Sequence, residues 1–455
     1  MKILLIDPTK RLEDGRLLKT GQLLFPSLAL PLLAALTPPD IEVSICVEQF
    51  EDVDFDQGAS LVGITSYSHS VLRGYEVADE FRRRGVHVVM GGMHVSMEPE
   101  EALQHADTVI VGEADELWPR FLDDFRRGAA QRIYRCHTRP SLRGLPVPRF
   151  SLLKKERYFV LQDKGILPQI LPMPLFPVQT ARGCPHSCSF CSVSLFSGTH
   201  YRPRPIDEVV NEIKAVGAKG CFFVDDNVFA DSRRAKDLFR ALIPLNIVWK
   251  GQATLYSADD QELLKLARAS GCRMIVVGME SISRASLGSI NKSFNRVENY
   301  ARQLAAYNEA GISVMACMMF GLPEERSEVF RDTCEFLMNH RVAHTMWFPL
   351  EPLPGTPLYR DLRAAGRLKN ERWWLDPALC GRLLEMKFTG LGMSEEDFAR
   401  GFRRYFREFY SLSNILKRTL LPPQKGFLGR LFINLLIMRR PRLLKQLGQV
   451  KALNG

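Results

Sequence analysis

The order of apolar and polar positions over residues 1–130 predicts short strands that alternate with amphipathic helices. The expected strands are nearly continuous apolar runs, which is typical of strands buried on both faces of a parallel sheet. We place strands at residues 3–6, 42–46, 61–65, 86–90 and 108–111, and helices at 28–36, 72–84 and 99–105. This region is therefore expected to be a doubly wound α/β domain, with ligands bound at the carboxyl ends of its strands.

A second alternating region occupies residues 176–392. Strands are expected at 177–180, 220–224, 247–253, 274–278, 313–320 and 345–349, and helices at 206–216, 233–242, 259–269, 296–310 and 327–339. Repeated strand–helix units of this kind predict a parallel barrel or partial barrel, whose active sites lie at the carboxyl face of the strands. Between the two regions, residues 131–175 lose the pattern and are rich in proline, which indicates a linker.

Composition is that of an ordinary globular protein of 455 residues, with 46% hydrophobic and 25% charged residues. The ten cysteines are mostly scattered, which favours reduced thiols and a cytoplasmic location over a secreted disulfide framework. The first residues form an apolar run too short for a signal peptide, and no apolar stretch is long enough to span a membrane.

The formal charge of +10 is concentrated in the basic helical region 393–455. Residues 401–455 hold twelve Lys and Arg against Glu408 alone, so the remainder is nearly neutral and nucleic-acid binding is not expected. This region contains an aromatic basic helix over 402–410 and an apolar segment over 427–438 flanked by basic residues. Two interpretations stay open, namely a helix lying on an anionic membrane surface and a helix that caps the barrel.

The chemistry is concentrated in the segment 181–191, Ala-Arg-Gly-Cys-Pro-His-Ser-Cys-Ser-Phe-Cys, which follows an expected strand. Cys184, Cys188 and Cys191 provide three thiols, whereas structural zinc sites and common iron–sulfur clusters take four protein ligands. Three thiols therefore leave room for an outside ligand. The alternative is a zinc knuckle that takes its fourth ligand from His186 or Cys221.

The CxxxCxxC spacing, with the aromatic Phe190 before the last cysteine, resembles the cluster-binding loop of the radical S-adenosylmethionine (SAM) enzymes. The resemblance implies a four-iron four-sulfur cluster held by the three thiolates, with SAM as ligand of the fourth iron. It also implies a partial (β/α)6 TIM-like barrel and an external electron donor of the flavodoxin or ferredoxin type.

The same resemblance implies SAM contacts at the ends of the barrel strands, with Phe190 as a further member of this set. The motif Asp-Asp-Asn at 225–227 offers Asp225 or Asp226 as acceptor for the SAM ammonium, where the family often has Gly-Gly-Glu. Gln252 and Glu280 follow on the next two strands, and Gly321 opens a Gly-Leu-Pro-Glu-Glu turn expected beside the adenine. The alternative for Asn227 is a structural role as a helix cap.

The strand ends of the first domain resemble the cobalamin-binding domain that precedes many radical SAM barrels. Glycines let the backbone approach a wide ring, and serines can hydrogen-bond its amide side chains. The residues implied are Thr65, Ser66, Ser68, His69, Gly91, Gly92, His94, Gly112 and Glu113. A flavodoxin-like or nucleotide-binding domain is the alternative.

One departure from the cobalamin mutases concerns the lower face of the corrinoid. The Asp-x-His-x-x-Gly motif that carries their cobalt ligand is absent, since the first strand ends Asp7-Pro8-Thr9. His69 is the nearest candidate for a lower axial ligand, with a hydrogen-bonded structural histidine as the alternative.

The combined resemblance implies a cobalamin-dependent radical SAM enzyme that methylates an unactivated carbon of a small-molecule or lipid-like substrate. It would do so through a 5′-deoxyadenosyl radical and methylcobalamin. A cyclase, oxidase or ring-rearranging enzyme without methyl transfer is the alternative within the class, and a non-enzymatic corrinoid- or zinc-binding module is the alternative outside it. The basic tail extends the expected cytoplasmic location to peripheral contact with the inner face of the membrane.

Overall fold

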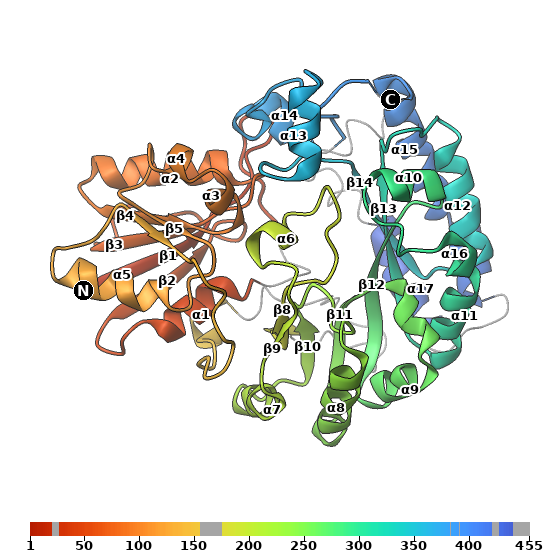
Figure 1. Cartoon of the computed structure of the whole chain (residues 1–455), viewed down its shortest axis with the longest axis horizontal. Helices are drawn as coiled ribbons and strands as arrows, with labels where there is room; N and C mark the ends of the chain where they lie inside the picture. The colour runs from red at the N-terminus through yellow and green to blue at the C-terminus, as the bar shows by residue number, and fades with distance from the viewer. Residues whose placement is uncertain (21–26, 155–174, 383, 391, 421–426, 440–455) are drawn as a thin grey trace.

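The computed structural model places two parallel sheets side by side, with helices around both (Figure 1). It describes residues 1–20, 27–154, 175–382, 384–390, 392–420 and 427–439. Both sheets have six strands, and every strand pair within them is parallel. The doubly wound domain and the partial barrel expected from the sequence are confirmed.

The first sheet has the strand order β2-β1-β3-β4-β5-β6. Its strands are β1 (Lys2–Asp7), β2 (Glu42–Val47), β3 (Leu61–Thr65), β4 (His87–Gly91), β5 (Thr108–Val111) and β6 (Ile133–Arg135). Its helices are α1 (Ala29–Leu36), α2 (Val71–Arg83), α3 (Met93–Met97), α4 (Pro99–Ala102) and α5 (Leu117–Arg126). The strand order reverses between β1 and β3, and this reversal is where doubly wound sheets bind their ligands.

Three elements of this domain fall outside the expected set, namely α3, α5 and β6. Helix α5 has a clear helical signal, because Trp118, Phe121 and Leu122 are buried at helical spacing. Strand β6 lies inside the stretch 131–175 expected to be a linker, where it pairs with β5. Its three residues are too few to show a period.

The second sheet is an open arc with the strand order β14-β13-β12-β11-β10-β7. Its strands are β7 (Leu175–Val178), β10 (Gly220–Phe223), β11 (Val248–Ala253), β12 (Cys272–Glu280), β13 (Ser313–Phe320) and β14 (His344–Pro349). The surrounding helices are α7 (Ile206–Ala215), α8 (Ser232–Leu242), α9 (Gln261–Ala269), α10 (Arg284–Ser289), α11 (Tyr300–Ala310) and α12 (Val329–Asn339). A short hairpin, β8 (Ala181–Arg182) with β9 (Arg202–Pro203), and α6 (Val193–Phe196) flank the cysteine loop.

Side chains alternate between the two faces of the barrel strands, as the period of a strand requires. On β11, Trp249 packs into the core under the helices, whereas Lys250 and Gln252 belong to the opposite face. Asp231 and Asp260 cap α8 and α9 by accepting hydrogen bonds from the backbone N–H groups of Arg234 and Leu263, both at 3.0 Å.

After β14 the chain crosses back to the first domain. This crossing segment, residues 352–390, contains α13 (Pro357–Ala364), the 3₁₀ helix η7 (Trp373–Leu375) and α14 (Pro377–Gly381). Trp373 and Trp374 are fully buried in a hydrophobic cluster with residues of β1, β3, β4 and α2. Trp374 Nε1 also donates to Glu101 Oε1 at 3.0 Å. The crossing segment therefore fixes the barrel to the first domain.

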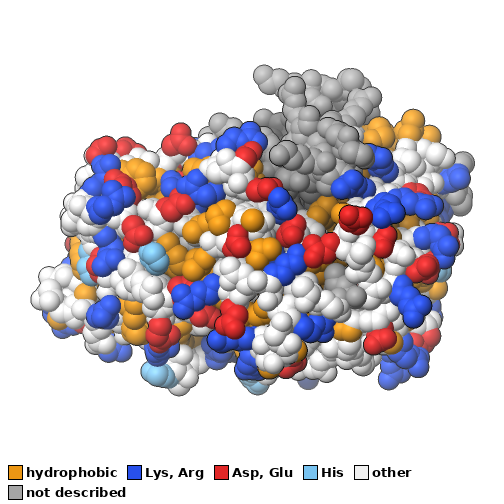
Figure 2. All heavy atoms as spheres, turned by 90° about the horizontal axis from the view of Figure 1, so that it is seen from above, with side chains coloured by type: hydrophobic (Ala, Val, Ile, Leu, Met, Phe, Trp, Pro, Cys, Tyr) orange, Lys and Arg blue, Asp and Glu red, His pale blue; other side chains and the backbone are white. Residues whose placement is uncertain are grey.

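The C-terminal helices α15 (Glu395–Phe409), α16 (Leu412–Leu420) and α17 (Phe427–Arg439) pack on the barrel. Tyr405 and Tyr410 hydrogen-bond to Thr345, so α15 covers the edge strand β14. Arg418 and Arg430 are buried although they belong to the basic tail. None of the helices in the described residues is both long and apolar enough to cross a bilayer. On the face seen from above, basic and acidic side chains are interspersed (Figure 2).

Candidate functional site

The three cysteines of the expected cluster lie on a loop between β8 and α6, and contacts from distant segments hold this loop. Ser189 N–H donates to Ile290 O at 3.0 Å, Asn291 Nδ2 donates to Ser187 O at 2.9 Å, and Leu358 N–H donates to Ser189 O at 2.9 Å. Gly183, which precedes the first cysteine, has φ +89°, and a Cβ there would lie 2.4 Å from His200 O. The loop therefore requires glycine at this position.

Burial raises the pKa of each of the three thiols, and that of Cys188 to about 11. Ordinary solution conditions therefore favour protonated thiols, whereas a metal cluster requires thiolates and supplies the positive charge that stabilises them. Cys188 is buried and the other two cysteines are half-buried, so a cluster here would be held inside the protein. The donor set fits a cluster with three protein thiolates.

The zinc alternative gains no support from the residues around the loop. Across the described residues, no three His, Cys, Asp or Glu side chains, the three cysteines included, converge on one point as the ligands of a single metal ion do. His186 stacks on Phe294 and its Nε2 lies 3.1 Å from the Tyr256 hydroxyl. Cys221 is buried in the helix-side core, and burial raises the pKa of its thiol to about 12.

A buried lysine beside the thiols is absent from the sequence-based set. Lys292 Nζ donates to Glu280 Oε1 at 2.8 Å and lies 5.8 Å from the centroid of the Phe190 ring. Gly278 makes room for this pair, since a Cβ there would lie 2.9 Å from Lys292 Nζ. Burial lowers the pKa of Lys292, but Glu280, Cys188 and Cys191 outweigh it and raise the pKa overall. Only the fold reveals this lysine, because it lies on a loop without a recognisable motif.

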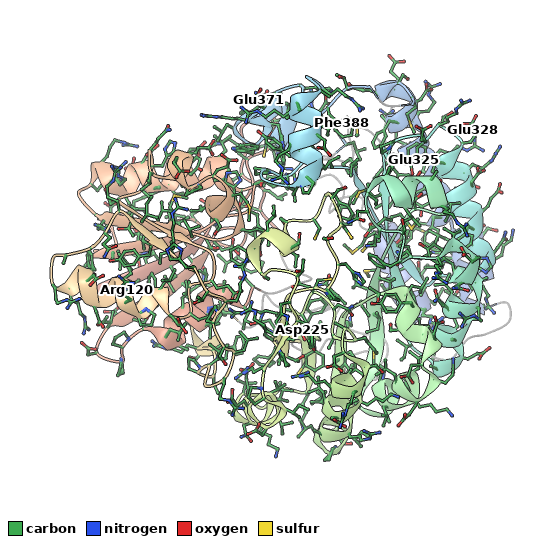
Figure 3. The ribbon with its side chains drawn as sticks, viewed as in Figure 1. Arg120, Asp225, Glu325, Glu328, Glu371 and Phe388 are labelled. Atoms are coloured by element: carbon green, nitrogen blue, oxygen red, sulfur yellow. The ribbon has the colours of Figure 1, made fainter. Side chains whose placement is uncertain are left out.

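The two aspartates that follow β10 have different roles. Asp225 lies on the barrel side of the molecule (Figure 3). It is buried and accepts a hydrogen bond of 2.6 Å from the backbone N–H of Thr180 and another from the Thr180 hydroxyl. Asp226 instead lines the cavity described below. Burial raises the pKa of both carboxyls to about 6. Asn227 Oδ1 accepts from Phe229 N–H at 3.1 Å, so its side chain stabilises the turn.

The Gly-Leu-Pro-Glu-Glu turn after β13 is closed by its own last glutamate. Glu325 accepts hydrogen bonds from the backbone N–H groups of Gly321 at 2.9 Å and Leu322 at 3.1 Å. Burial raises the pKa of Glu325 to about 7, although these bonds and one from Ser281 lower it. Gly321 therefore offers no free N–H group to an adenine, and its φ of +89° shows why the turn uses glycine.

One cavity of about 970 Å³ joins the strand ends of both domains. Among the residues expected to bind cofactors, its lining includes Thr65, His69, Gly91, Gly92, Gly112, Glu113, Asp226 and Gln252. Gly92 has φ +99°, and a Cβ there would lie 2.7 Å from Thr65 Oγ1. Because glycine has no side chain, the backbone at the ends of β3, β4 and β5 is accessible from the cavity, as the close approach of a wide corrinoid requires. The first domain thus fits a corrinoid at this edge.

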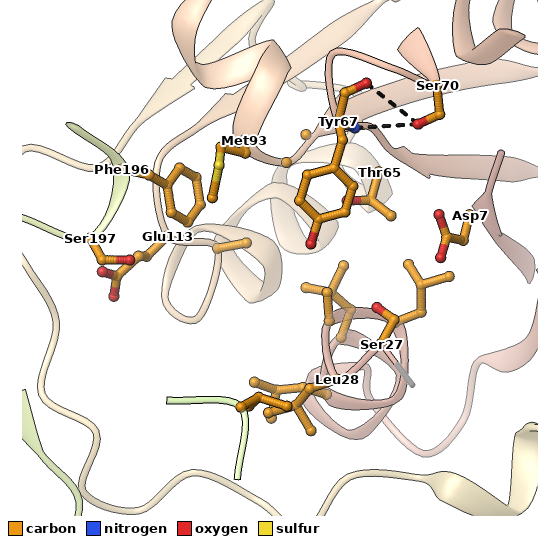
Figure 4. Close-up of a pocket in the computed structure, with 18 of the residues that line it drawn as sticks. Asp7, Ser27, Leu28, Thr65, Tyr67, Ser70, Met93, Glu113, Phe196 and Ser197 are labelled. Atoms are coloured by element: carbon orange, nitrogen blue, oxygen red, sulfur yellow. Dashed lines mark hydrogen bonds between the residues drawn. The ribbon is translucent and has the colours of Figure 1, made fainter. Parts of the chain in front are cut away.

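Two cavity residues of the first domain were missed by the sequence-based reasoning. Tyr67 follows β3, and its ring points into the cavity (Figure 4). Asp7 ends β1 and lines the same cavity. Burial and the neighbouring Glu48 raise the pKa of Asp7 to about 7. Position at a strand end was the available signal for both.

Three other residues expected to contact cobalamin serve internal contacts. Ser68 Oγ lies 3.0 Å from His94 Nδ1, and His94 Nε2 lies 3.3 Å from Glu101 Oε1. Ser68, His94 and Glu101 are all buried, and none of them lines the cavity. Ser66 is buried beneath Gly74, where an added Cβ would lie 2.6 Å from its hydroxyl, and this hydroxyl has no hydrogen-bond partner in the described residues. These side chains support the strand ends from below.

His69 is paired with a residue of the barrel. Its Nε2 lies 2.7 Å from Glu351 Oε2, just beyond β14. Burial lowers the pKa of His69, but Glu351 outweighs it and raises the pKa to about 9. An imidazolium has no free lone pair for a metal, so this geometry favours an interdomain ion pair over a lower axial ligand.

Glu113 likewise links the two domains. It accepts from Arg182 Nη1 at 2.9 Å and from Arg202 Nη1 at 3.0 Å, and Asp115 accepts from Arg182 Nη2 at 2.9 Å. The side chains of Glu113 and Asp115 are nearly fully buried, and Arg182 lies two residues before Cys184. This ion-pair network holds the thiol loop against the first domain.

Two family models match the chain, the "Radical SAM superfamily" over residues 178–337 and the "B12 binding domain" over residues 34–122. The bacteriochlorophyllide d C-8(2)-methyltransferase of Chlorobaculum tepidum is 29% identical over 413 residues, 88% of each chain. The C-12(1)-methyltransferase of the same organism is 26% identical over 426 residues, 92% of this chain and 89% of that one. The TsrM methyltransferase structure from Kitasatospora setae, with tryptophan and a SAM analogue bound, covers 98% of this chain and 99% of its own. It has a TM-score of 0.66 at 18% identity, so that likeness concerns the fold.

Proposed function

The chain belongs to the radical SAM superfamily, among the members with a B12-binding domain, and from this premise we propose that it methylates a carbon atom of an apolar small molecule. Its cofactors are a four-iron four-sulfur cluster, SAM and cobalamin. Two relatives over most of its length are named as carbon-position methyltransferases of bacteriochlorophyllide d, which supports methyl transfer.

The cavity shared by the two domains is the observation that carries this proposal. Gly91 and Gly92 of the first domain and Asp226 and Gln252 of the barrel line one space, whose wall also includes Arg182, two residues before Cys184. A substrate placed between them would face both cofactor sites without leaving the cavity. Holding reactants in one oriented site removes much of the entropic cost of their encounter.

When bound, the three cofactors supply the radical and methyl-group chemistry, and the chain's own residues hold and shield them. We assign the cluster to Cys184, Cys188 and Cys191, and SAM to the neighbourhood of Phe190, Asp226, Gln252 and Glu280. The ammonium of Lys292 would balance negative charge at the thiolates. The glycines at the ends of β4 and β5 would carry the corrinoid, with Tyr67 projecting towards it.

The barrel side of the cavity supports an apolar substrate. Its apolar lining there includes Phe222, Val224, Val276, Met346 and Phe348, beside the polar Gln179, Arg182, Asp226 and Gln252. Such a surface favours a hydrophobic ring system or a lipid-like body. A macrocycle of the bacteriochlorophyllide type is the first substrate to test, given the names of the relatives.

Product analysis with methyl-labelled SAM tests the function. The anaerobically reconstituted protein is incubated with bacteriochlorophyllide d and a panel of apolar ring compounds, a reductant and SAM carrying a deuterated methyl group. Label in a carbon-methylated product is the expected result. Substrate-dependent 5′-deoxyadenosine without label in any product would instead indicate a cyclase, oxidase or rearrangement. Failure to take up about four irons would remove the enzymatic interpretation altogether.

Two finer points concern partners. We propose that a flavodoxin- or ferredoxin-type protein in the cytoplasm reduces the cluster, because the chain needs an outside electron.

We also propose peripheral contact with anionic membranes through α16 and α17, where Leu412 and Leu428 are more than half exposed. Flotation with anionic liposomes tests this contact. The matched variant is Leu412→Gln/Leu428→Gln, because deleting the tail would also strip α15 from β14. Flotation lost in this variant supports the contact, and unchanged flotation contradicts it.

A further inference from the structure

A lysine faces the inside of the barrel from the middle of β11. Trp249 and Lys250 are consecutive, so they occupy opposite faces of the strand, and Trp249 packs into the core under the helices. The register places Lys250 next to Phe222 of β10, and Gln252 follows two residues later on the same face. Phe222 and Gln252 both line the cavity. Lys250 therefore lies on the inner face of the barrel, below Gln252 and outside the residues that line the cavity.

The ammonium of Lys250 has no partner in the described part of the chain. It donates none of the hydrogen bonds and forms none of the ion pairs found there, whereas the buried Lys292 near the thiols is paired with Glu280. Burial lowers the pKa of Lys250, with no carboxylate acting against it. The side chain is half-buried, and an ammonium partly removed from water without a partner is stabilised when an anionic group binds beside it.

A second unpartnered polar group faces the same interior. His344 begins β14 and is 1% exposed, and its Nδ1 atom has no hydrogen-bond partner in the described residues. It shares a face of β14 with Met346 and Phe348, which line the cavity. Burial and the positive charges of Arg418, Arg430 and Lys250 lower the pKa of His344 to about 3. Its ring is therefore neutral and able to donate one N–H hydrogen bond.

We propose that Lys250 and His344 form a carboxylate-binding site at the floor of the barrel, which holds the anionic end of an otherwise apolar substrate. The proposal rests on the proposed function and specifies its substrate class. The N–H groups of one ammonium and one neutral imidazole suit the two oxygens of a carboxylate. The apolar body of the substrate would then lie against Phe222, Met346 and Phe348, with its carbon skeleton extending towards the thiol loop and the corrinoid floor.

A pair of fluorescent probes tests this site without knowledge of the substrate. Pyrenebutyrate and pyrenebutanol have the same apolar body and differ in the carboxylate. Binding is measured by fluorescence on full-length protein loaded with cluster, cobalamin and S-adenosylhomocysteine, so that the cofactor sites are occupied. The variants are Lys250→Met, Lys250→Arg and His344→Leu. Lys219→Met is the matched control, because Lys219 is exposed at the start of the neighbouring strand.

The unaltered protein is expected to bind pyrenebutyrate at least about tenfold more tightly than pyrenebutanol, as a charge-assisted hydrogen bond implies. Lys250→Met should abolish this preference while pyrenebutanol binding stays the same, and Lys250→Arg and Lys219→Met should keep it. His344→Leu should reduce it. Equal binding of the two probes by the unaltered protein, or a preference that survives in Lys250→Met, would overturn the proposal.

Iron content and near-ultraviolet circular dichroism establish that each variant is folded and loaded. Should Lys250→Met fail to fold, Lys250→Gln takes its place, because Lys10 and Arg182 also line the cavity and a preference must be shown to depend on Lys250. Methyl transfer is measured separately with labelled SAM. A protein that methylates its substrate but shows no preference for the carboxylate probe would contradict this site and leave the proposed function intact. A protein that prefers the carboxylate probe but transfers no methyl group would contradict the proposed function and leave this site intact.

Discussion

Lys292 and Glu280 form a buried ion pair, 2.8 Å between Nζ and Oε1, beside the loop that carries the three thiols. The lysine acts on Cys188 more strongly than Glu280 does, and the two have opposite effects on that thiol's pKa. Net charge near an iron–sulfur cluster is one of the determinants of its reduction potential. This pair therefore bears on the reduction potential of a cluster held by the loop.

Lys292→Met should make the cluster harder to reduce. We expect the midpoint potential to fall on the order of 50 mV, since roughly 59 mV of a one-electron potential corresponds to about 1.4 kcal/mol. Redox titration followed by electron paramagnetic resonance measures this. Lys292→Arg keeps the charge and should keep the potential. An unchanged potential in Lys292→Met, with full iron content, would show that the ammonium does not act on the cluster.

Replacing any one of Cys184, Cys188 or Cys191 by Ala should reduce bound iron to a small fraction of the unaltered level after anaerobic reconstitution. The matched control is Cys221→Ala, which removes a buried thiol from the core and should keep the full iron content. Chemical iron analysis and the absorption spectrum provide the measurement. Loss of bound metal in Cys221→Ala, with zinc in place of iron in the unaltered protein, would revive the zinc site.

Substitutions of the two neighbouring aspartates should affect different properties, one SAM binding and the other the stability of the fold. Asp226→Asn should weaken SAM binding to the cluster-loaded protein about tenfold or more, because a charge-assisted hydrogen bond is lost in the cavity. Asp225→Asn should instead lower the stability of the fold by roughly 1–3 kcal/mol, because Thr180 loses its charged acceptor. Equilibrium SAM binding and denaturant unfolding measure the two effects. If Asp225→Asn weakened SAM binding and Asp226→Asn lowered the stability of the fold, the roles assigned to the two aspartates would have to be exchanged.

Glu113→Gln should destabilise the protein by roughly 3–5 kcal/mol, as removal of one partner from a buried ion pair does. Arg182 and Arg202 would lose their shared carboxylate. Glu116→Gln makes the same substitution at an exposed site three residues later and should change stability by less than about 0.5 kcal/mol. Denaturant unfolding compares the two. Equal stabilities, with cobalamin binding lost only in Glu113→Gln, would favour direct contact with the corrinoid.

The ion pair between His69 and Glu351 predicts a pH dependence of stability. The pKa of His69 is raised to about 9 in the folded protein, above the ordinary value of 6.5. Its stabilising contribution is therefore complete below about pH 6.5 and is lost as the pH rises through about 9. The thermal midpoint should fall across that window, and His69→Gln should flatten this part of the profile. A His69→Gln profile that matches the unaltered one would exclude the pair as the cause.

Local patterns in the sequence account for the elements and for the thiol loop, whereas contacts between distant segments do not appear in them. Strands β3, β5 and β13 lie where their apolar runs predict, because burial on both faces leaves a continuous signal. The spacing of the three cysteines is likewise local. The partners of Glu113, His69 and Glu280 come from segments far away in the chain, and only the fold brings them together. Several strand-end residues expected to touch cofactors are consequently engaged by protein groups.

Trp373 and Trp374, which complete the hydrophobic cluster of the first domain, have a consequence for how the chain is made. During synthesis the first sheet leaves the ribosome long before these tryptophans do, so part of its apolar surface stays uncovered until residues 352–390 emerge. Transiently exposed hydrophobic surface makes a folding intermediate prone to aggregation, which is one reason why chaperones exist. The first domain is therefore a poor unit to express alone or to graft onto another barrel, and the two halves of the enzyme mature as one.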